Sequence, residues 1–415
     1  MSEWKKYKLS ELYTMSSGIS TTKNQSGKGN PFLSFSTVYN NYFLPDVLTD
    51  KMDTSEKDSV RFSIEEGDVF LTRTSETADE LAFSSVALKN YSNATYSGFL
   101  KRLRPVDKSK IYPKFIGFYL RSPYFRKVIN ANTVMTLRAS FNEAMFSYLE
   151  IYLPSFEIQK KIGDLLYSLE KKIIENQKIN IQLESMAKTL YDYWFVQFDF
   201  PDENGKPYKS SGGKMVYNEM LKREIPEGWE GEPLSKFVSI KKSTIKPFEN
   251  PERLFKHYSI PEFDKTGNYE IQPGSAIKSN KFLVSSTDIL VSKLNPWFNR
   301  VIFNEEQQAI ASTEFIVMHV EKNFMKNFLY QIVTSNKFID YCTQNATGTS
   351  NSHKRVNPTI VSNYPTAYKE SVVIEYDKRI RHLLEMKRKR ETENLSLSYL
   401  RAFLLPLLLS NNIRL

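Results

Sequence analysis

Residues able to carry out catalytic chemistry are few and scattered along this sequence. The four histidines, His257, His319, His353 and His382, lie far from one another and from Cys342, the single cysteine. This spacing does not match a set of metal ligands, and one cysteine forms neither an internal disulfide nor a multi-cysteine site. The phosphate-loop motif of ATP-driven proteins is also absent from the sequence. We therefore expect no catalytic residue, no metal and no cofactor.

One motif could hold a base for modification. Asn295-Pro296-Trp297-Phe298 resembles the Asn-Pro-Pro-aromatic motif with which adenine methyltransferases grip a flipped base, although it lacks the second proline. A glycine loop for S-adenosylmethionine should follow an apolar strand, whereas Gly27-Lys28-Gly29 lies in a polar segment. A self-contained adenine methyltransferase that carries its own recognition domain is therefore the alternative hypothesis, not the preferred one.

Residues suited to reading DNA bases follow an apolar run in each half of the sequence. Arginine and lysine recognise guanine in the major groove, whereas asparagine and glutamine recognise adenine. In the first half the candidates are Arg73, Thr74 and Ser75, directly after the run Val69–Leu71, together with Arg138 and Ser140. In the second half they are Lys293, Asn295, Asn299, Arg300, Ser350, Asn351, Ser352, His353, Lys354 and Arg355. For any single residue, a phosphate contact or a solvated surface charge is the alternative.

The charge balance favours a polyanionic partner. The 415 residues include 57 lysines and arginines against 47 acidic residues, which gives a net charge of +10. Nucleic acid is the natural ligand of such a chain, although many proteins carry a basic surface that contacts only water. The charge therefore nominates nucleic acid as the partner.

No segment reads as a targeting signal or a membrane span. The start, Met1–Ser10, is polar and contains lysines, and the longest apolar run, Phe403–Leu409, includes Pro406 and is too short to cross a bilayer. The single cysteine fits a reducing compartment. We expect a soluble cytoplasmic protein without membrane contact.

The elements that position the candidate residues occur twice. Similar segments recur about 220 residues apart, as expected for two copies of one module with loop insertions. The matched pairs are the segments beginning at Trp4 and Trp229, Gly67–Thr72 and Thr287–Ser292, Phe118–Ser122 and Leu329–Ser335, and Glu157–Ile162 and Glu375–Ile380. Each copy reads as a mixed, strand-rich region followed by one long helix.

The first long helix is expected at about Glu157–Phe198. Its apolar residues recur at alternating steps of four and three, which indicates a coiled-coil seam. This seam comprises Ile162, Leu166, Leu169, Ile173, Leu183, Ala187, Leu190 and Trp194, interrupted by Asn176 and Asn180. An ordinary amphipathic helix on a domain core would show a similar pattern, but about forty residues make a helix of about 60 Å, longer than a small domain is wide.

The second long helix is expected at about Glu375–Leu405. Its seam is weaker and consists of Ile380, Leu383, Leu384, Leu395 and Leu404 around the basic run Lys387–Arg390. That run is read as a solvated helix face, with contact to DNA or to a partner as the alternative. Between the two copies, Asp199–Met215 is rich in turn formers and poor in apolar residues, so we interpret it as a linker.

Several stretches carry a family resemblance that spans nearly the whole chain. They are Tyr193–Tyr208 with Ser210–Met215 and Ile225–Trp229, Leu153-Pro154 with Glu157–Ile162, and Thr347–Ser350 with Arg355–Asn357. In these residues the chain resembles the specificity (S) subunits of type I restriction-modification systems. It departs from the family pattern at Ile158-Gln159, where the glutamate is shifted by one place, and at Tyr364-Pro365 and Tyr376-Asp377 in the second copy.

The resemblance implies an α+β fold, with two similar strand-rich target recognition domains joined by two long helices packed as an antiparallel coiled coil. The implied divisions are residues 1–155 for the first recognition domain, 156–201 for the first helix and linker, 202–370 for the second domain and 371–415 for the second helix. Each domain would read one half of a bipartite DNA target.

The resemblance also implies partners that carry out the chemistry. The helices would bind two methyltransferase (M) subunits, which hold S-adenosylmethionine and methylate adenine at N6, and nuclease/translocase (R) subunits would join for cleavage. The predicted partner-binding helix positions are Ile162, Leu166, Leu169, Ile173, Leu183, Leu190, Ile380 and Leu384. A scaffold that keeps the helices but does not read DNA is a further alternative.

Overall fold

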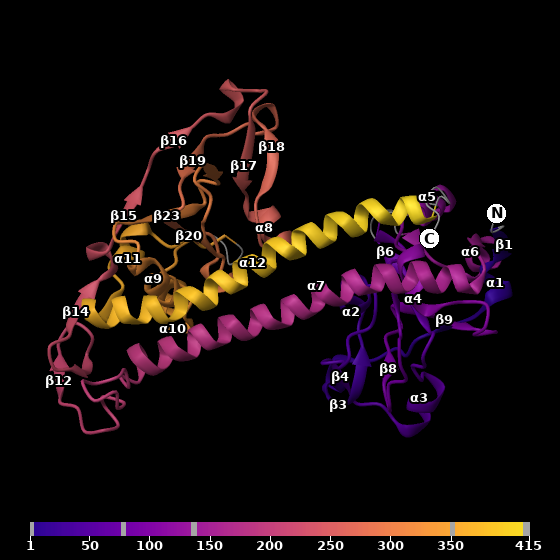
Figure 1. Cartoon of the computed structure of the whole chain (residues 1–415), viewed down its shortest axis with the longest axis horizontal. Coiled ribbons are helices and arrows are strands. Elements are labelled where there is room, and N and C mark those ends of the chain that lie inside the picture. Colours follow the sequence, from indigo (N-terminus) through magenta and orange to yellow (C-terminus); the bar gives the residue numbers. More distant parts are fainter. Residues whose placement is uncertain (1–3, 76–79, 134–138, 349–352, 410–415) are drawn as a thin grey trace. The chain divides into compact units, whose positions relative to one another are not determined.

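The computed structural model describes residues 4–75, 80–133, 139–348 and 353–409 (Figure 1). The chain forms two compact units. The first unit combines Met1–Lys178 with Arg390–Leu415, and the second is Ile179–Lys389. The long helices α7 (Phe156–Tyr191) and α12 (Glu370–Leu409) each begin in one unit and end in the other.

The first unit contains an antiparallel sheet with the strand order β2-β9-β5-β7. The strands are β2 (Tyr13–Ser17), β9 (Leu100–Pro105), β5 (Val69–Thr72) and β7 (Ser84–Val86). All of β5 is buried, as expected for a short and continuous apolar run. A second sheet has the order β4-β3-β8, from β4 (Lys51–Met52), β3 (Ser26–Leu33) and β8 (Thr95–Tyr96). A separate ladder pairs β1 (Lys5–Lys8) with β11 (Glu150–Leu153).

Short helices pack around these sheets. They are α1 (Leu9–Leu12), α2 (Phe35–Asn40), α3 (Glu56–Arg61), α4 (Pro113–Tyr119), α5 (Pro123–Asn132) and α6 (Glu143–Tyr148). Helix α5 starts where the sequence places a cap, because the Ser122 hydroxyl accepts a hydrogen bond from the backbone amide of Phe125 at 3.2 Å. Helices α2 and α4 both contact β7, so they cover that end of the sheet.

The second unit contains an antiparallel sheet with the order β15-β23-β20-β21. The strands are β15 (Val238–Lys241), β23 (Phe315–Val320), β20 (Asp288–Ser292) and β21 (Val301–Phe303). A second sheet has the order β16-β19-β22-β17-β18, from β16 (Thr244–Ile245), β19 (Lys281–Val284), β22 (Ala309–Ala311), β17 (Leu254–Tyr258) and β18 (Glu270–Pro273). Two further ladders pair β12 (Met215–Asn218) with β13 (Arg223–Pro226) and β14 (Glu230–Pro233) with β24 (Pro365–Tyr368).

The helices of the second unit follow the same order as those of the first. They are α8 (Ile260–Thr266), α9 (Met325–Val333), α10 (Asn336–Gln344) and α11 (Pro358–Ser362). Helix α10 begins as α5 does, because the Ser335 hydroxyl accepts from the backbone amide of Phe338 at 3.3 Å. Strand β17 pairs with β22 in parallel, just as β3 pairs with β8 in the first unit.

Matching hydrogen bonds confirm the internal repeat. The backbone amide of Leu9 donates to the carbonyl of Leu149 at 2.9 Å, and that of Leu234 donates to Tyr364 at 3.0 Å. Two strand-rich units with equivalent strand orders, joined by two long helices, are the α+β fold expected from the sequence.

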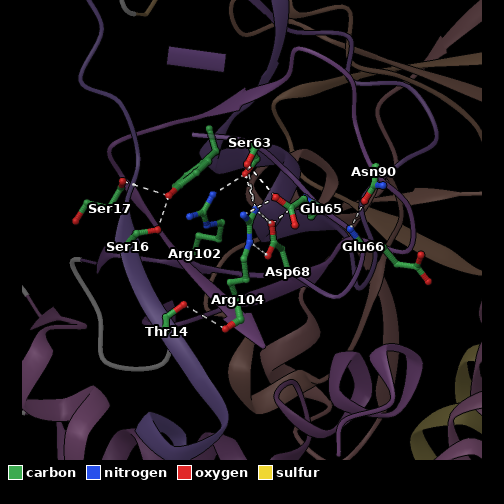
Figure 2. Close-up of polar contacts among 11 residues, drawn as sticks. Thr14, Ser16, Ser17, Ser63, Glu65, Glu66, Asp68, Asn90, Arg102 and Arg104 are labelled. Atoms are coloured by element: carbon green, nitrogen blue, oxygen red, sulfur yellow. Dashed lines mark hydrogen bonds and ion pairs between the residues drawn. The ribbon is translucent and has the colours of Figure 1, made fainter. Parts of the chain in front are cut away.

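Each unit buries one carboxylate at the entry to its central strand. Asp68 is fully buried and accepts hydrogen bonds from Nε and Nη2 of Arg104 at 2.8 and 2.7 Å (Figure 2). At the equivalent place Asp288, also fully buried, accepts from Lys241 Nζ at 2.9 Å and contacts His319 Nδ1 at 2.8 Å. Because a buried carboxylate is costly unless it is paired, these networks fix the turn that enters each strand.

The long helices pack against each other in an antiparallel direction within each unit. In the first unit Ile162 and Leu166 of α7 share a buried cluster with Leu405 and Leu408 of α12. Further along α7, the Asn176 side-chain amide donates to Glu393 and Asn394 at 2.7 and 2.9 Å. In the second unit Glu184 pairs with Lys387 at 2.7 Å, and the carbonyl of Ala187 accepts from the hydroxyl of Tyr376 at 3.1 Å. Later positions on α7 therefore meet earlier positions on α12.

The expected seam of α7 is largely correct. Ile162, Leu166, Ile173, Leu183, Ala187 and Trp194 are buried, as are the polar residues Asn176 and Asn180, whereas Leu169 and Leu190 are only partly buried. On α12 Ile380 is buried, and Leu383, Leu384 and Leu404 are partly buried. The assignment of Leu395 was wrong, because its side chain is 56% exposed.

The segment between the two copies is folded rather than extended as a linker. Asp199 accepts hydrogen bonds from the backbone amide and the hydroxyl of Ser210 at 2.7 and 2.6 Å. Phe200 stacks on Tyr208 with ring centres 4.8 Å apart and packs against Trp229 at 5.1 Å. The turn formers of this segment thus serve a compact loop that is anchored to the aromatic core.

Candidate nucleic-acid interface

In the first unit, a short ladder brings the candidate residues together. Arg73 directly follows β5, and β6 (Thr74–Ser75) pairs with β10 (Ala139–Ser140). The backbone amide of Phe141 closes this ladder by donating to the carbonyl oxygen of Arg73 at 2.8 Å. Two segments that are far apart in the sequence therefore form one surface.

The candidate side chains of the first unit differ in exposure. Arg73 and Ser140 are exposed and Thr74 is half-buried, whereas Ser75 is buried and its hydroxyl donates to Glu80 at 3.3 Å. The Arg73 guanidinium makes one long contact, at 3.4 Å, with the carbonyl of Gly98. Arg73 and Ser140 are thus placed to contact a ligand, whereas Ser75 stabilises the fold through its hydrogen bond to Glu80. Arg138 lies outside the described residues.

The second unit repeats this arrangement. Lys293 directly follows β20, and its carbonyl oxygen accepts from the backbone amide of Val356 at 3.0 Å. The backbone amide of Lys293 donates to Glu314 at 2.8 Å, just as that of Arg73 donates to Phe99 at 2.9 Å. The same end of the same strand therefore presents a basic residue in both copies, and a later segment of the chain covers it.

Two asparagines shape the loop after Lys293. Asn295 and Asn299 both have φ of 49°, in the left-handed region that asparagine tolerates better than most residues. They flank the 3-10 turn Pro296–Phe298, and the Asn295 side-chain oxygen accepts from the backbone amide of Lys354 at 3.1 Å. The amide group in the Asn-Pro-Trp-Phe motif is thus part of the loop scaffold, which leaves it badly placed to hold a flipped base. The Asn299 side chain is exposed and donates to Thr334 at 3.5 Å.

The two arginines of this surface are already paired with carboxylates. Arg300 donates to both oxygens of Asp264 at 2.6 and 2.7 Å, and Arg355 donates to both oxygens of Glu314 at 2.9 and 3.1 Å. The hydrogen bonds that Arg355 donates to Glu314 also raise the pKa of the Arg355 guanidinium. A paired guanidinium fork must exchange its carboxylate before it can bind guanine.

The remaining candidates of the second unit lie around Lys293. Lys293 and Lys354 are half-buried, and His353 is exposed. Ser350, Asn351 and Ser352 fall outside the residues that the structure describes. Among the candidates that the structure describes, the cations with no ion pair to a carboxylate are therefore Arg73 in the first unit and Lys293 and Lys354 in the second.

Three basic residues next to the first surface bond to groups within the unit and so stabilise the fold. Lys101 is buried and donates to the Ser17 hydroxyl at 2.9 Å, and Arg102 donates to the carbonyl of Ser63 at 2.6 Å. Arg104 binds Asp68, as Figure 2 shows. These three residues are therefore charges on β9 that stabilise the fold.

Exposed aromatic residues beside both surfaces were not predicted. Phe99 is 66% exposed next to Arg73, and Trp297 and Phe298 are 38% and 56% exposed after Lys293. Sequence offers only a weak signal for them, since aromatic residues next to proline or glycine are common in buried turns as well.

A polar cavity of about 540 Å³ lies elsewhere in the second unit. Its wall includes Lys326, whose Nζ donates to the carbonyl of Ser286 at 2.6 Å, and Asn327, which donates to Asp377 at 2.7 Å. Burial lowers the pKa of Lys326 to about 8. None of the candidate base-reading residues lines it.

Metal binding and membrane insertion are two other classes of function. Within the described ranges, no group of three or more histidine, cysteine, aspartate or glutamate residues is arranged to hold a metal ion. Among the helices in the same ranges, none is both long and apolar enough to cross a bilayer.

The predicted partner-binding positions lie mostly inside the chain itself. Ile162, Leu166, Ile173, Leu183 and Ile380 are buried, and Leu169, Leu190 and Leu384 are partly buried. Their side chains hold the helices to each other and to the cores, so the surface that the helices offer consists of other residues. Exposed apolar side chains on the same helices are Leu165, Ile181, Met186, Leu395, Tyr399, Leu400 and Phe403.

Comparisons with known proteins agree on one family. Residues 1–185 match the family model described as "Type I restriction modification DNA specificity domain". The MjaIX specificity subunit of Methanocaldococcus jannaschii, a type I restriction enzyme, is 30% identical over 140 residues, which cover 34% of this chain and 29% of that protein. The HindI specificity subunit of Haemophilus influenzae is 27% identical over 204 residues, which cover 48% of this chain and 42% of that protein.

The matched region spans less than half the length of either curated relative. Among solved structures, the S subunit of a type I restriction-modification system from M. genitalium is similar over 98% of this chain and 96% of its own, with a TM-score of 0.58. At 14% sequence identity this likeness shows a common fold.

Proposed function

We propose that the chain, whose residues 1–185 match a type I restriction-modification DNA specificity domain, selects the DNA target of such a system. In this proposal each unit reads one half of a bipartite sequence in double-stranded DNA. The chain supplies recognition and does not itself modify or cut the DNA.

The duplicated surface is the observation that carries the proposal. A basic residue, Arg73 or Lys293, stands at the end of the central strand in each unit, and the amide of Phe141 or Val356 fixes its carbonyl. Two copies of one surface suit a ligand that offers two similar features, and the grooves of a DNA duplex offer such features at regular intervals. The net charge of +10 favours the same polyanion.

Base readout in this proposal comes from the exposed and half-buried side chains of each surface. In the first unit these are Arg73, Thr74 and Ser140, and in the second Lys293, Asn299, His353 and Lys354. Lysine and arginine are suited to guanine, and asparagine to adenine. Arg300 and Arg355 take part only if DNA phosphates or bases replace Asp264 and Glu314.

Partner subunits supply the chemistry. Two methyltransferase (M) subunits would bind S-adenosylmethionine and methylate adenine, and nuclease/translocase (R) subunits would join for cleavage. The exposed apolar positions of α7 and α12, such as Ile181 and Phe403, offer contact area for such partners. The recognition domains proposed for this role are residues 1–155 and 202–370.

Methylome sequencing tests the proposal. A host that carries this chain together with its cognate methyltransferase should gain methylated adenines within one bipartite motif. A host with the methyltransferase alone should lack that motif. Methylation by the purified chain without any partner, accompanied by binding of radiolabelled S-adenosylmethionine, would instead support the self-contained methyltransferase.

A further inference from the structure

The second recognition surface carries two adjacent aromatic side chains on one turn. Trp297 and Phe298 occupy the 3-10 turn Pro296–Phe298, with 38% and 56% of their side chains exposed. Their ring centres are 6.0 Å apart. The turn begins three residues after Lys293, so the aromatic rings belong to the same surface as the cation. Exposed aromatic pairs beside a polar rim usually mark a contact site.

The turn is rigid. Asn295 and Asn299, both at φ of 49°, close it at its two ends. Backbone amides of Phe298 and Asn299 donate to Asn295 and Pro296 at 3.1 and 3.0 Å, and Asn295 is bound in turn to Lys354. Left-handed backbone at residues other than glycine persists only where surrounding contacts enforce it, and such strain is concentrated at functional sites. The rings are therefore held ready for a ligand and lose little entropy on contact.

The packing of Phe298 limits how it can meet DNA. The guanidinium carbon of Arg300 lies 4.5 Å from the centre of the Phe298 ring, so one face of the ring is covered. Arg300 is itself held by both oxygens of Asp264. A wedge between stacked base pairs needs both faces of the ring. Phe298 can therefore offer its outer face and edge to a groove, but it cannot insert between bases.

The major groove of DNA presents one apolar group to such a surface, the C5-methyl group of thymine. We propose, building on the function proposed above, that Trp297 and Phe298 recognise a thymine methyl group in the half-site read by the second unit. Lys293 and Lys354 lie on the same surface, where they would hold the duplex by its phosphates or by a neighbouring guanine. The half-site must contain a thymine, because the adenine that is methylated pairs with one.

Deoxyuridine tests this inference directly, because it differs from thymidine only in lacking the methyl group. The chain is assembled with its methyltransferase, and binding is measured on duplexes in which each thymidine of the second half-site is replaced in turn. At one position the wild-type complex should bind about fourfold more weakly, the effect of burying one methyl group. Phe298→Ala should bind both duplexes equally at that position, whereas Phe298→Leu should keep part of the difference.

A matched control comes from the same unit. Phe248 also follows a proline in a 3-10 turn, Pro247–Glu249, and is 42% exposed. Its turn precedes the start of β17. At the other end of that strand, the carbonyl of Tyr258 accepts a hydrogen bond from the backbone amide of Ser312, two residues before Glu314 of the recognition surface. Phe248→Ala should therefore leave the thymidine-to-deoxyuridine difference unchanged.

Three outcomes separate the possibilities. If the wild-type complex shows no sequence preference at all, the proposed function fails. If it binds its motif but Phe298→Ala does not change the loss of affinity caused by deoxyuridine at any position, the proposed function is retained and the methyl-reading inference is overturned. If Phe298→Ala instead reduces DNA bending equally on both duplexes, the ring acts on DNA shape, which also overturns the inference. As a control for folding, Phe298→Ala should unfold at the same midpoint concentration of urea as the wild type.

Discussion

The backbone amide of Val356 donates a hydrogen bond to the carbonyl oxygen of Lys293 at 3.0 Å. Phe141 and Arg73 form the same bond in the first unit at 2.8 Å. In both copies a segment from late in the recognition domain therefore crosses the end of the central strand. The basic side chain is presented at a fixed backbone position, as sequence readout requires.

Replacing the two basic residues should change the two half-sites separately. Arg73→Ala should weaken recognition by about 1–3 kcal/mol and relax the first half-site, and Lys293→Ala should do the same to the second. The measurement is the methylated motif of each variant with the cognate methyltransferase. Lys108→Ala is the control. The backbone amide of Arg73 bonds to Phe99, just before the start of β9, whereas the exposed Lys108 follows the end of that strand. Loss of both half-sites in a folded single variant would contradict independent readout.

Binding should weaken steeply with salt. Lysines and arginines that neutralise phosphates release counterions, so the logarithm of affinity should fall linearly with the logarithm of salt, with a slope near −0.9 per phosphate contacted. Titration of the assembled methyltransferase between about 50 and 200 mM salt measures the slope. If Lys354 contacts a phosphate, Lys354→Ala should reduce the slope by about one unit. A flat response in the wild-type complex would argue against several phosphate contacts.

The arrangement of elements could be predicted because it depends on local patterns and on repetition. The run Val69–Leu71 is continuous and apolar, so a buried strand followed by an exposed Arg73 could be inferred, and the repeat placed Lys293 at the same point. The seam of α7 follows from its periodicity. Leu395 was assigned to the weaker seam of α12 but is exposed, because periodicity alone does not show where the neighbouring helix stops covering it.

The pairing of charges across the fold could not be predicted. Arg300 and Arg355 match the side chains that read guanine, but the fold brings Asp264 and Glu314 to them from segments distant in sequence. Asn295 likewise suits adenine, yet its oxygen accepts from Lys354. Such contacts depend on tertiary structure, which residue type and spacing do not reveal.

Arg104 should be required for the stability of the first unit. Asp68 is fully buried and receives two hydrogen bonds from Arg104, so Arg104→Met would leave a buried carboxylate without its cation. Breaking such a pair from one side typically costs about 3–5 kcal/mol. Hydrogen exchange should increase in Met1–Lys178 and not in Ile179–Lys389. The double variant Arg104→Met with Asp68→Asn should recover part of the loss, and an equal loss in both variants would contradict the charge-pair explanation.

The stability of the second unit should rise with pH through the titration of Lys326. Burial lowers the pKa of Lys326 to about 8 in the folded chain, below the ordinary value of 10.5. Between these pH values the unfolded chain binds more protons than the folded one, so unfolding becomes less favourable as pH increases. The free energy of unfolding of the wild type, relative to Lys326→Met, should rise by up to about 1.4 kcal/mol per pH unit.

Urea unfolding at several pH values between 7.5 and 10.5 measures this difference. Lys337→Met, which replaces an exposed lysine of the same unit, is the control for the loss of one lysine. A difference between wild type and Lys326→Met that stays constant with pH would show that Lys326 keeps its proton in the folded state.

The end of α12 should stabilise the first unit although it is distant in sequence. Leu405 is 5% exposed and shares a buried cluster with Ile162 and Leu166, so Leu405→Ala removes apolar contacts from that core and leaves a cavity. Substitutions of this kind cost about 2–5 kcal/mol. In the full-length chain, hydrogen exchange should accelerate in Met1–Lys178 while Ile179–Lys389 keeps its protection. Leu395→Ala is the matched control, because this leucine is on the same helix and 56% exposed. Equal destabilisation by the two substitutions would mean that Leu405 does not pack in the core of the first unit.

If Leu405 does pack there, a domain exchange should depend on the end of α12. Replacing residues 1–155 with the corresponding domain of a relative should give a less stable hybrid than replacing them together with the end of α12. Only the second exchange preserves the native contacts of Leu405.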